Sequence, residues 1–350
     1  MNKILHTQVK EEGVQLGDYP SLHSPLEPNM QITMGDLHGN ALKLMRILIQ
    51  FHIFNLSKEA YHKLVAIYEL ESQDVTVEVK KAFDDIIAQA QVNILPPGFF
   101  LRFIGDELCD RGSNDYFILK LIEKIGVSNV PFEILLSNHG YEFLKTYLQG
   151  LRETHSYMEQ TSFGVSLAAL RYLMNKKVVL EDEIFDIVEK HYLPHVKLFG
   201  CTIHNITKKH EAVTVYMHAP NPFSHVKKVA DCLGVPYEDA TSPALMETIV
   251  ACNKAFQKIL KDRTLDHLFE HLSSFEQEQH PIFQLIWERT TPTLPPIFHF
   301  DLYVVHGHDG CGNVHPSLRG RVFNLDNICG KGPNLFAPFD NSVLISTVIS

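Results

Sequence analysis

The segment GDLHGN at residues 35–40 follows a short apolar run, QITM, that predicts a β-strand. A second segment, GDELCDRG at residues 105–112, follows the apolar run FFLRFI in the same way. Each segment places acidic groups directly after a strand, and the first adds an imidazole at His38. Because such groups bind divalent ions, and paired ions neutralise a phosphate ester, the two segments indicate a two-metal phosphoesterase site.

The composition is that of an ordinary globular protein of 350 residues, with 45% hydrophobic and 21% charged residues. The formal net charge of −10 argues against a general binder of nucleic acid or anionic membranes, which needs clustered Lys and Arg. No window approaches the roughly 20 apolar residues of a transmembrane segment. The six cysteines include no CxxC pair, so we expect reduced thiols and a cytoplasmic location.

Short apolar runs alternate with amphipathic stretches from residue 31 onward, a pattern typical of βαβ units. Ligands bind beyond the carboxyl ends of such strands. Polar groups follow three of these strands: Asp36 and His38, residues 106–111, and Asn138 with His139. We therefore expect the three strand ends to converge on one site, with further strands before His218, His306 and Asp326.

Two segments show helical spacing of apolar residues. Residues 55–95 are predicted to form a helical-hairpin insertion, and residues 223–284 a helical cap with Ser242 as N-cap of one helix. The expected organisation is an N-terminal extension at 1–29 and one domain at 30–350. The cap could be a lid or a partner surface, or both segments could only enlarge the core.

Five motifs occur in a fixed order: GDLHGN, GDELCDRG, SNHG, MHA and HGHD. In this order they resemble the phosphoprotein phosphatase branch of the calcineurin-like metallophosphatases, from about Met30 to Ile349. The segments LIWERT at 285–290 and FNLDN at 323–327 are similar to those of small bacterial and phage enzymes. The resemblance implies an α/β sandwich of two mixed sheets flanked by helices, with metals at the strand ends.

The resemblance also implies a ligand set for two divalent ions, with Mn as the expected metal and Fe or Zn as alternatives. Asp36 and His38 would bind the first ion, Asp106 would bridge both, and Asn138, His218 and His308 would complete the second. The HGH sequence offers two imidazoles, and the family uses the one after the glycine. We therefore expect His308 to be a ligand and His306 to be its neighbour.

The same resemblance assigns catalytic roles. His139 would protonate the leaving oxygen, with Asp110 orienting its ring, while a hydroxide activated by both ions attacks phosphorus. Arg111 and Arg289 would clamp the phosphoryl oxygens, because a guanidinium matches their geometry. Cys109 lies inside the motif without a dedicated base, so we expect it to fill space rather than act as a nucleophile.

Two motifs depart from the family pattern. GDELCDRG is one residue longer than the usual GDxVDRG, and SNHG has Ser137 and Gly140 in place of the glycine and glutamate of GNHE. With the helical segments, these changes resemble the Wip-type effector phosphatases that Legionella delivers into host cells. That resemblance implies a phosphoprotein substrate, secretion into the host cytosol and a host partner at the helical insertions; it leaves phosphotyrosine or phosphoserine/threonine preference open.

Three functions remain in competition. The leading one is a metal-dependent phosphoprotein phosphatase. The second is a hydrolase of dinucleoside polyphosphates or another small phosphoester, because related enzymes share the motifs. The third is a catalytically silent metal-binding interaction module, suggested by the SNHG change.

Overall fold

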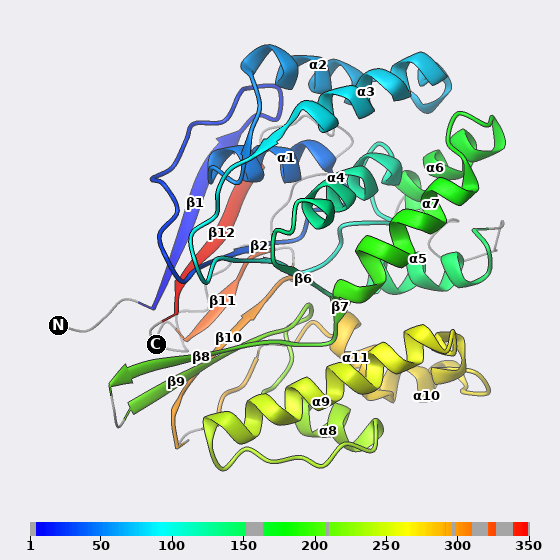
Figure 1. The fold of residues 1–350 in the computed structure, drawn as a ribbon. Coiled ribbons are helices and arrows are strands. Elements are labelled where there is room, and N and C mark those ends of the chain that lie inside the picture. Colours follow the sequence, from blue (N-terminus) through cyan, green and yellow to red (C-terminus); the bar gives the residue numbers. More distant parts are fainter. Residues whose placement is uncertain are drawn as a thin grey trace.

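The computed structural model describes residues 5–151, 164–207, 210–290, 292–295, 299–309, 321–326 and 339–348. Its larger sheet has six strands in the order β1-β12-β2-β5-β6-β7 (Figure 1). Strands β2, β5, β6 and β7 are parallel, whereas β12 runs antiparallel to both β1 and β2. The strand bounds are His6–Val14, Phe339–Thr347, Met30–Met34, Phe100–Phe103, Phe132–Leu135 and Val196–Lys197, in sheet order.

A smaller sheet has four strands in the order β11-β10-β9-β8. These strands are Val322–Asn324, Asp301–His306, His210–Tyr216 and Gly200–Thr207. Only β8 is antiparallel to its neighbour, so this sheet is mixed as well. A buried apolar cluster from both sheets joins them: Ile104, Leu135, Tyr216, Val305, Leu325 and Leu344. The fold is thus mixed α/β, with the carboxyl ends of both sets of parallel strands available to one site.

The helices that follow the parallel strands are α1 (Ala41–Gln50), α4 (Asp115–Val127) and α5 (Asn138–Leu148). Figure 1 shows them along the larger sheet, on the side away from β8–β11, together with α6 (Val165–Asn175) and α7 (Glu181–Ile187). Each of the first three begins at a side-chain cap, Asn40, Asn114 or Ser137, that accepts a backbone hydrogen bond. A π-helical turn (Val188–Tyr192) and a 3-10 turn (Leu193–His195) lead into β7.

Helices α2 (Lys58–Tyr68) and α3 (Val77–Gln89) occupy the segment for which the sequence predicts a helical hairpin. A 3-10 turn (Ser72–Asp74) joins them, and the short strands β3 (Phe54–Asn55) and β4 (Gln91–Val92) pair at the base. Whether this unit is an insertion remains a prediction.

The segment predicted as a cap holds α8 (His225–Cys232), α9 (Ser242–Lys261), a 3-10 turn (Leu265–Leu268), α10 (Ser274–Gln279) and α11 (Pro281–Trp287). The N-cap of α9 is Thr241 rather than the expected Ser242, because the Thr241 hydroxyl accepts from the backbone N–H of Ala244 at 3.3 Å. Helix α9 contacts β8 of the smaller sheet, and its Asn253 hydrogen-bonds with the backbone of Leu198 and Phe199 in the connection between β7 and β8. The last part of the segment, from the 3-10 turn to α11, approaches α5.

The N-terminal residues supply an edge strand of the larger sheet, because β1 pairs along its length with β12. His6 on β1 also reaches the smaller sheet, where its Nε2 lies 2.9 Å from the Thr214 hydroxyl on β9. The first strand therefore ties both sheets together. Among the described helices, none has the length and apolar character that a membrane crossing requires.

Candidate active site

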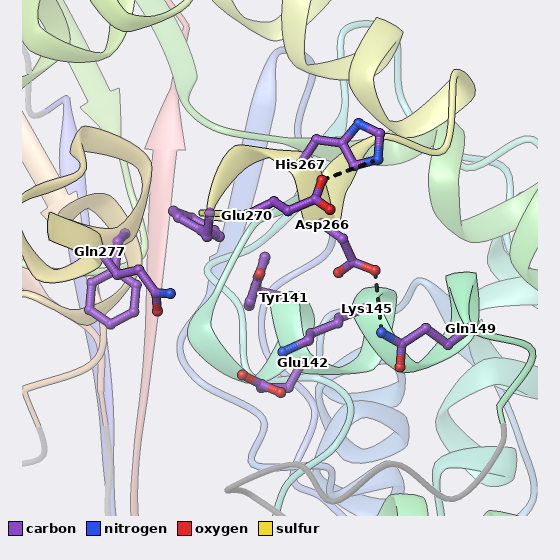
Figure 2. A pocket seen from close by; sticks show the side chains of 10 residues that line it. Tyr141, Glu142, Lys145, Gln149, Asp266, His267, Glu270 and Gln277 are labelled. Carbon is purple, nitrogen blue, oxygen red and sulfur yellow. Dashed lines mark hydrogen bonds and ion pairs between the residues drawn. The ribbon is translucent and has the colours of Figure 1, made fainter. Parts of the chain in front are cut away.

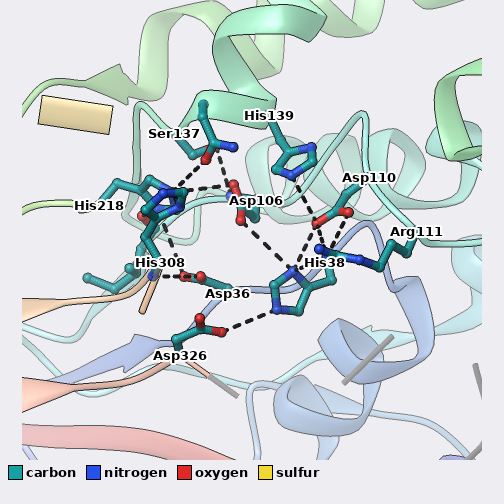
Figure 3. Close-up of polar contacts among 12 residues, drawn as sticks. Asp36, His38, Asp106, Asp110, Arg111, Ser137, His139, His218, His308 and Asp326 are labelled. Atoms are coloured by element: carbon teal, nitrogen blue, oxygen red, sulfur yellow. Dashed lines mark hydrogen bonds and ion pairs between the residues drawn. The ribbon is translucent and has the colours of Figure 1, made fainter. Parts of the chain in front are cut away.

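Side chains from six strand ends meet at one place (Figure 3). They follow β2, β5 and β6 of the larger sheet and β9, β10 and β11 of the smaller one. All are nearly or fully buried, and they include every metal ligand expected from the motifs: Asp36, His38, Asp106, Asn138, His218 and His308. The parallel strands of both sheets thus direct their carboxyl ends toward a shared centre.

The first group comprises Asp36, His38 and Asp326, each of which offers a ligand atom within 4.8 Å of the others. His38 Nε2 lies 3.3 Å from Asp326 Oδ1, and His38 Nδ1 lies 2.8 Å from Asp110 Oδ2. Burial opposes protonation of His38, but the hydrogen bonds to these two carboxylates outweigh it and raise the pKa of His38 to about 9. A cation among the carboxylates would take the place of that proton.

The second group comprises Asp106, His218 and His308. His218 Nδ1 donates to the carbonyl of Ile104 at 3.1 Å, an assignment that leaves Nε2 of a neutral ring without a proton. This Nε2 lies 3.0 Å from Asn138 Oδ1 and 3.4 Å from Asp106 Oδ1. Three lone-pair atoms therefore face one another in a buried place, an arrangement that a divalent cation would stabilise.

Further observations support metal binding by these donor atoms. Within the described residues, the buried atoms Asp106 Oδ1 and His308 Nε2 have no hydrogen-bond partner. Burial, followed by the nearby charges of Asp326 and Asp106, raises the pKa of Asp36 well above its usual range. Leaving so many carboxylates in a buried place without cations costs free energy. Carboxylate, imidazole and amide oxygen donors together suit Mn, Fe or Zn.

The backbone around these ligands is held in an unusual conformation. His38, Asp106 and His308 have φ angles of 52°, 54° and 63°, in the left-handed region that L residues rarely adopt. A Cβ at Gly307 would collide with Asp36 Oδ1, so only glycine lets the end of β10 approach this carboxylate. Such strain concentrates at functional sites, where the surrounding fold holds it in place.

His139 lies at the start of α5, beside the metal-capable groups (Figure 3). Its Nδ1 donates to the carbonyl of Cys109 at 2.7 Å, which directs Nε2 toward the site. Asp110 Oδ2 is 3.6 Å from His139 Nε2, beyond hydrogen-bond distance, while Asp110 bonds to His38 and Arg111. The carbonyl of Cys109 therefore orients the His139 ring from Nδ1, while Asp110 lies beside Nε2; the orienting role of Asp110 stays a prediction.

The two expected arginines occupy different places. Arg111 reaches into the centre, with Nη1 2.9 Å from Asp110 Oδ1 and 3.2 Å from His38 Nδ1. Arg289 is exposed, and its Nη1 donates to the carbonyl of His308 at 3.0 Å. Arg111 thus lies beside the first group and Arg289 at the rim beside the second.

His306 and Cys109 lie near the centre but outside the ligand groups. His306 is buried, its Nδ1 donates to the carbonyl of Gly307, and none of the metal-capable groups found among the described residues includes it. The thiol of Cys109 is buried, and burial raises its pKa well above the usual value. A thiol that resists ionisation is a poor nucleophile.

Asp326 is the site residue that the sequence analysis missed. It follows β11 and is 2% exposed. Its carboxylate lies with Oδ1 beside His38 Nε2 and is, after Asp36, the second carboxylate of the first group. The signal was present, because RVFNL is an apolar run followed directly by an acid, as QITM is before Asp36. A single aspartate after a strand is too common to be selected without the fold.

The family described as "WipA-like, phosphatase domain" matches residues 100–331. Among solved structures, the phosphatase domain of the Legionella effector WipB is 29% identical, with a TM-score of 0.70 over 81% of this chain and 100% of that chain. No curated protein sequence matches the chain.

Proposed function

Because the chain belongs to the family of WipA-like phosphatase domains, we propose that it is a metal-dependent phosphatase that hydrolyses phosphomonoesters on proteins. The observation that carries the proposal is the convergence of carboxylate, imidazole and amide donors from six strand ends on one buried centre. Any one of these motifs alone could be a set of structural polar residues, so the proposal depends on their convergence. The fold is proposed to be a calcineurin-like sandwich, supported by the two joined mixed sheets.

Two divalent ions would be held by Asp36, His38, Asp106, Asn138, His218 and His308. Asp326 would add a carboxylate to the first ion, supported by its distance of 3.3 Å from His38 Nε2. When bound, such ions supply a water-derived nucleophile at neutral pH and neutralise phosphoryl charge. Mn is the proposed ion, because mixed oxygen and imidazole donors suit it.

The chain's own residues would complete the reaction. Arg111 would bind phosphoryl oxygens, since its guanidinium is already placed beside the centre and its planar fork matches their geometry. His139 would give the proton to the leaving oxygen from Nε2, because Nδ1 is committed to the Cys109 carbonyl. Arg289 would contact the phosphoryl group only from the rim.

The working compartment is proposed to be the cytosol of a host cell. The support is the likeness to the phosphatase domain of a Legionella effector, whose whole length is matched. A phosphoprotein substrate would then come from the host, and the helical segments at 55–95 and 223–284 would be places for a host partner.

The test is hydrolysis of phosphotyrosine, phosphoserine and phosphothreonine peptides by metal-stripped protein, with and without added Mn. Mn-dependent turnover that is lost in Asp106→Asn is expected, and the preferred peptide would give the substrate class. Asp301→Asn, a strand aspartate that pairs with His210 at 2.9 Å outside the site, is the matched control. Equal turnover with and without metal, or full activity in Asp106→Asn, would overturn the proposal.

A further inference from the structure

A pocket of about 510 Å³ lies between α5 and the segment that runs from the 3-10 turn at 265–268 to α11. Figure 2 shows its side chains from both walls. Helix α5 contributes one wall and the second segment the other; the lining residues are Tyr141, Glu142, Lys145, Gln149, Asp266, His267, Phe269, Glu270, Gln277 and Phe283.

The pocket is acidic. Glu142, Asp266 and Glu270 place three carboxylates on its walls, against one ammonium group from Lys145. Glu142 Oε2 and Asp266 Oδ1 are buried and have no hydrogen-bond partner among the described residues. Burial raises the pKa of Glu142, because no group beside it compensates fully for the lost water. A cationic group in the pocket would satisfy both oxygens.

The pocket also has an aromatic lining. The rings of Tyr141 and Phe269 meet edge to face at 5.3 Å, and Phe283 packs against Phe269 at 6.1 Å. Rings of this kind accommodate the methylene stem of a long basic side chain and attract its charged end. An acidic pocket with an aromatic wall therefore fits Lys or Arg better than it fits an apolar or acidic side chain.

The pocket and His139 of the candidate active site lie along the same helix, α5. Glu142 follows His139 by three residues on α5, which is about 4.5 Å along the helix axis and on the same face. On the opposite wall, Phe283 stacks on Trp287, whose ring meets that of His308 at 6.1 Å. An extended peptide advances roughly 3.3 Å per residue, so two or three residues cover about 7–10 Å, which is enough to reach from the helix position of His139 past that of Glu142.

We propose that this pocket binds a Lys or Arg side chain of the phosphoprotein substrate, two to three residues from the phosphorylated residue. The inference rests on the proposed function and adds a sequence preference to it. The carboxylates of Glu142 and Asp266 bind the cationic group, and the rings of Tyr141 and Phe269 contact its stem.

The test compares phosphopeptides that differ only in one residue. Arg, Ala or Glu is placed two or three positions before or after the phosphorylated residue, and kcat/KM is measured with Mn for each peptide. The readout is the ratio between the Arg and Ala peptides, which cancels any effect of a variant on the metal centre. Asp266→Asn and Glu142→Gln remove the pocket charges, while Asp262→Asn, an exposed residue paired with Lys258, is the matched control.

A ratio of about tenfold is expected for the native enzyme at one or more positions, with the Glu peptides poorest. It should fall to within twofold in both pocket variants, stay unchanged in Asp262→Asn, and decrease as salt screens the charges. Equal rates for Arg and Ala peptides, or a ratio that survives both pocket variants, would overturn the proposal. Failure of the proposed function is distinguishable, because it abolishes Mn-dependent turnover of p-nitrophenyl phosphate as well.

Discussion

The carboxylate of Glu107 lies directly beside Gly140: a Cβ built on the glycine would stand 3.4 Å from Glu107 Oε1. Glu107 is fully buried and accepts a hydrogen bond from the Tyr192 hydroxyl. Gly140 stands where the GNHE motif of the phosphoprotein phosphatases, which SNHG resembles, has a glutamate, and Glu107 belongs to the motif GDELCDRG, which is one residue longer than the GDxVDRG it resembles. One loop thus supplies a carboxylate close to where the other has lost it.

Gly140→Glu introduces the glutamate of the GNHE motif and is expected to destabilise the protein. It places a second carboxylate against buried Glu107, which costs about 2–4 kcal/mol if neither charge gains a partner. The midpoint temperature of thermal unfolding and the Mn-dependent turnover of p-nitrophenyl phosphate would both decrease. The double variant Glu107→Ala/Gly140→Glu should recover part of each, whereas additive losses would refute the coupling; Gly17→Glu, at an exposed glycine with open space around it, is the control.

This relationship explains what the sequence could and could not predict. The strand ends at Asp36, Asp106 and Asn138 were predictable, because each motif is local and follows an apolar run. The proximity of Glu107 and Gly140 was not, because it depends on how β5 and β6 pair and on how the loop after β5 closes. The motifs revealed that each had changed, but only the fold shows that the two changes meet.

The N-terminal strand is the second feature that local pattern did not reveal. Residues 6–14, HTQVKEEGV, are rich in charged and polar residues, and their partner strand β12 lies more than 300 residues away along the chain. Edge strands commonly carry charge, so composition gives little sign of them. Asp326 also reaches His38 through contacts distant in sequence, because β11 before it pairs with β10 in the smaller sheet, which is why this acid was recognisable only in the structure.

Asp326→Asn is expected to weaken metal binding. The substitution removes a negative charge 3.3 Å from His38 Nε2 while keeping the shape of the side chain. Loss of an oriented partner at a metal site typically lowers affinity by roughly 10–100-fold. Metal content after dialysis and calorimetric titration with Mn would measure the change independently of activity. Unaltered Mn affinity would show that Asp326 has no part in binding, and Asp301→Asn again serves as control.

His139→Gln should separate protonation of the leaving group from metal binding. If His139 is the general acid, kcat for phosphoserine peptides falls by about 10²–10⁴-fold, because an alkoxide is a poor leaving group. Turnover of p-nitrophenyl phosphate should fall much less, because p-nitrophenolate leaves without a proton. Bound Mn, measured in the same preparation, should remain at the native level. Equal losses for both substrates would contradict the role. His210→Gln, which removes an exposed histidine paired with Asp301 away from the site, controls for the loss of an imidazole.

Stability should decrease as pH falls below 6.5, through His6 and His204. These rings lie between the two sheets with centroids 5.3 Å apart, and both contact the Thr214 hydroxyl. Burial, then the charge of the neighbouring ring, lowers the pKa of His6 to about 3, and burial lowers that of His204 to about 4. In the unfolded chain both titrate near 6.5, so below that pH only the unfolded state takes up protons.

The sign of the effect follows from this difference. Above pH 6.5 both states are neutral and the stability is complete; it is lost as pH falls toward the lowered pKa values of the folded protein. Each histidine would cost at most about 1.4 kcal/mol between pH 7.5 and 5.5. Urea unfolding at these two pH values measures the loss, which should be smaller in His204→Gln. The control His210→Gln removes an exposed ring paired with Asp301 and should keep the native pH dependence. If the free energy of unfolding changed equally with pH in all three proteins, the buried pair would not take up protons on unfolding.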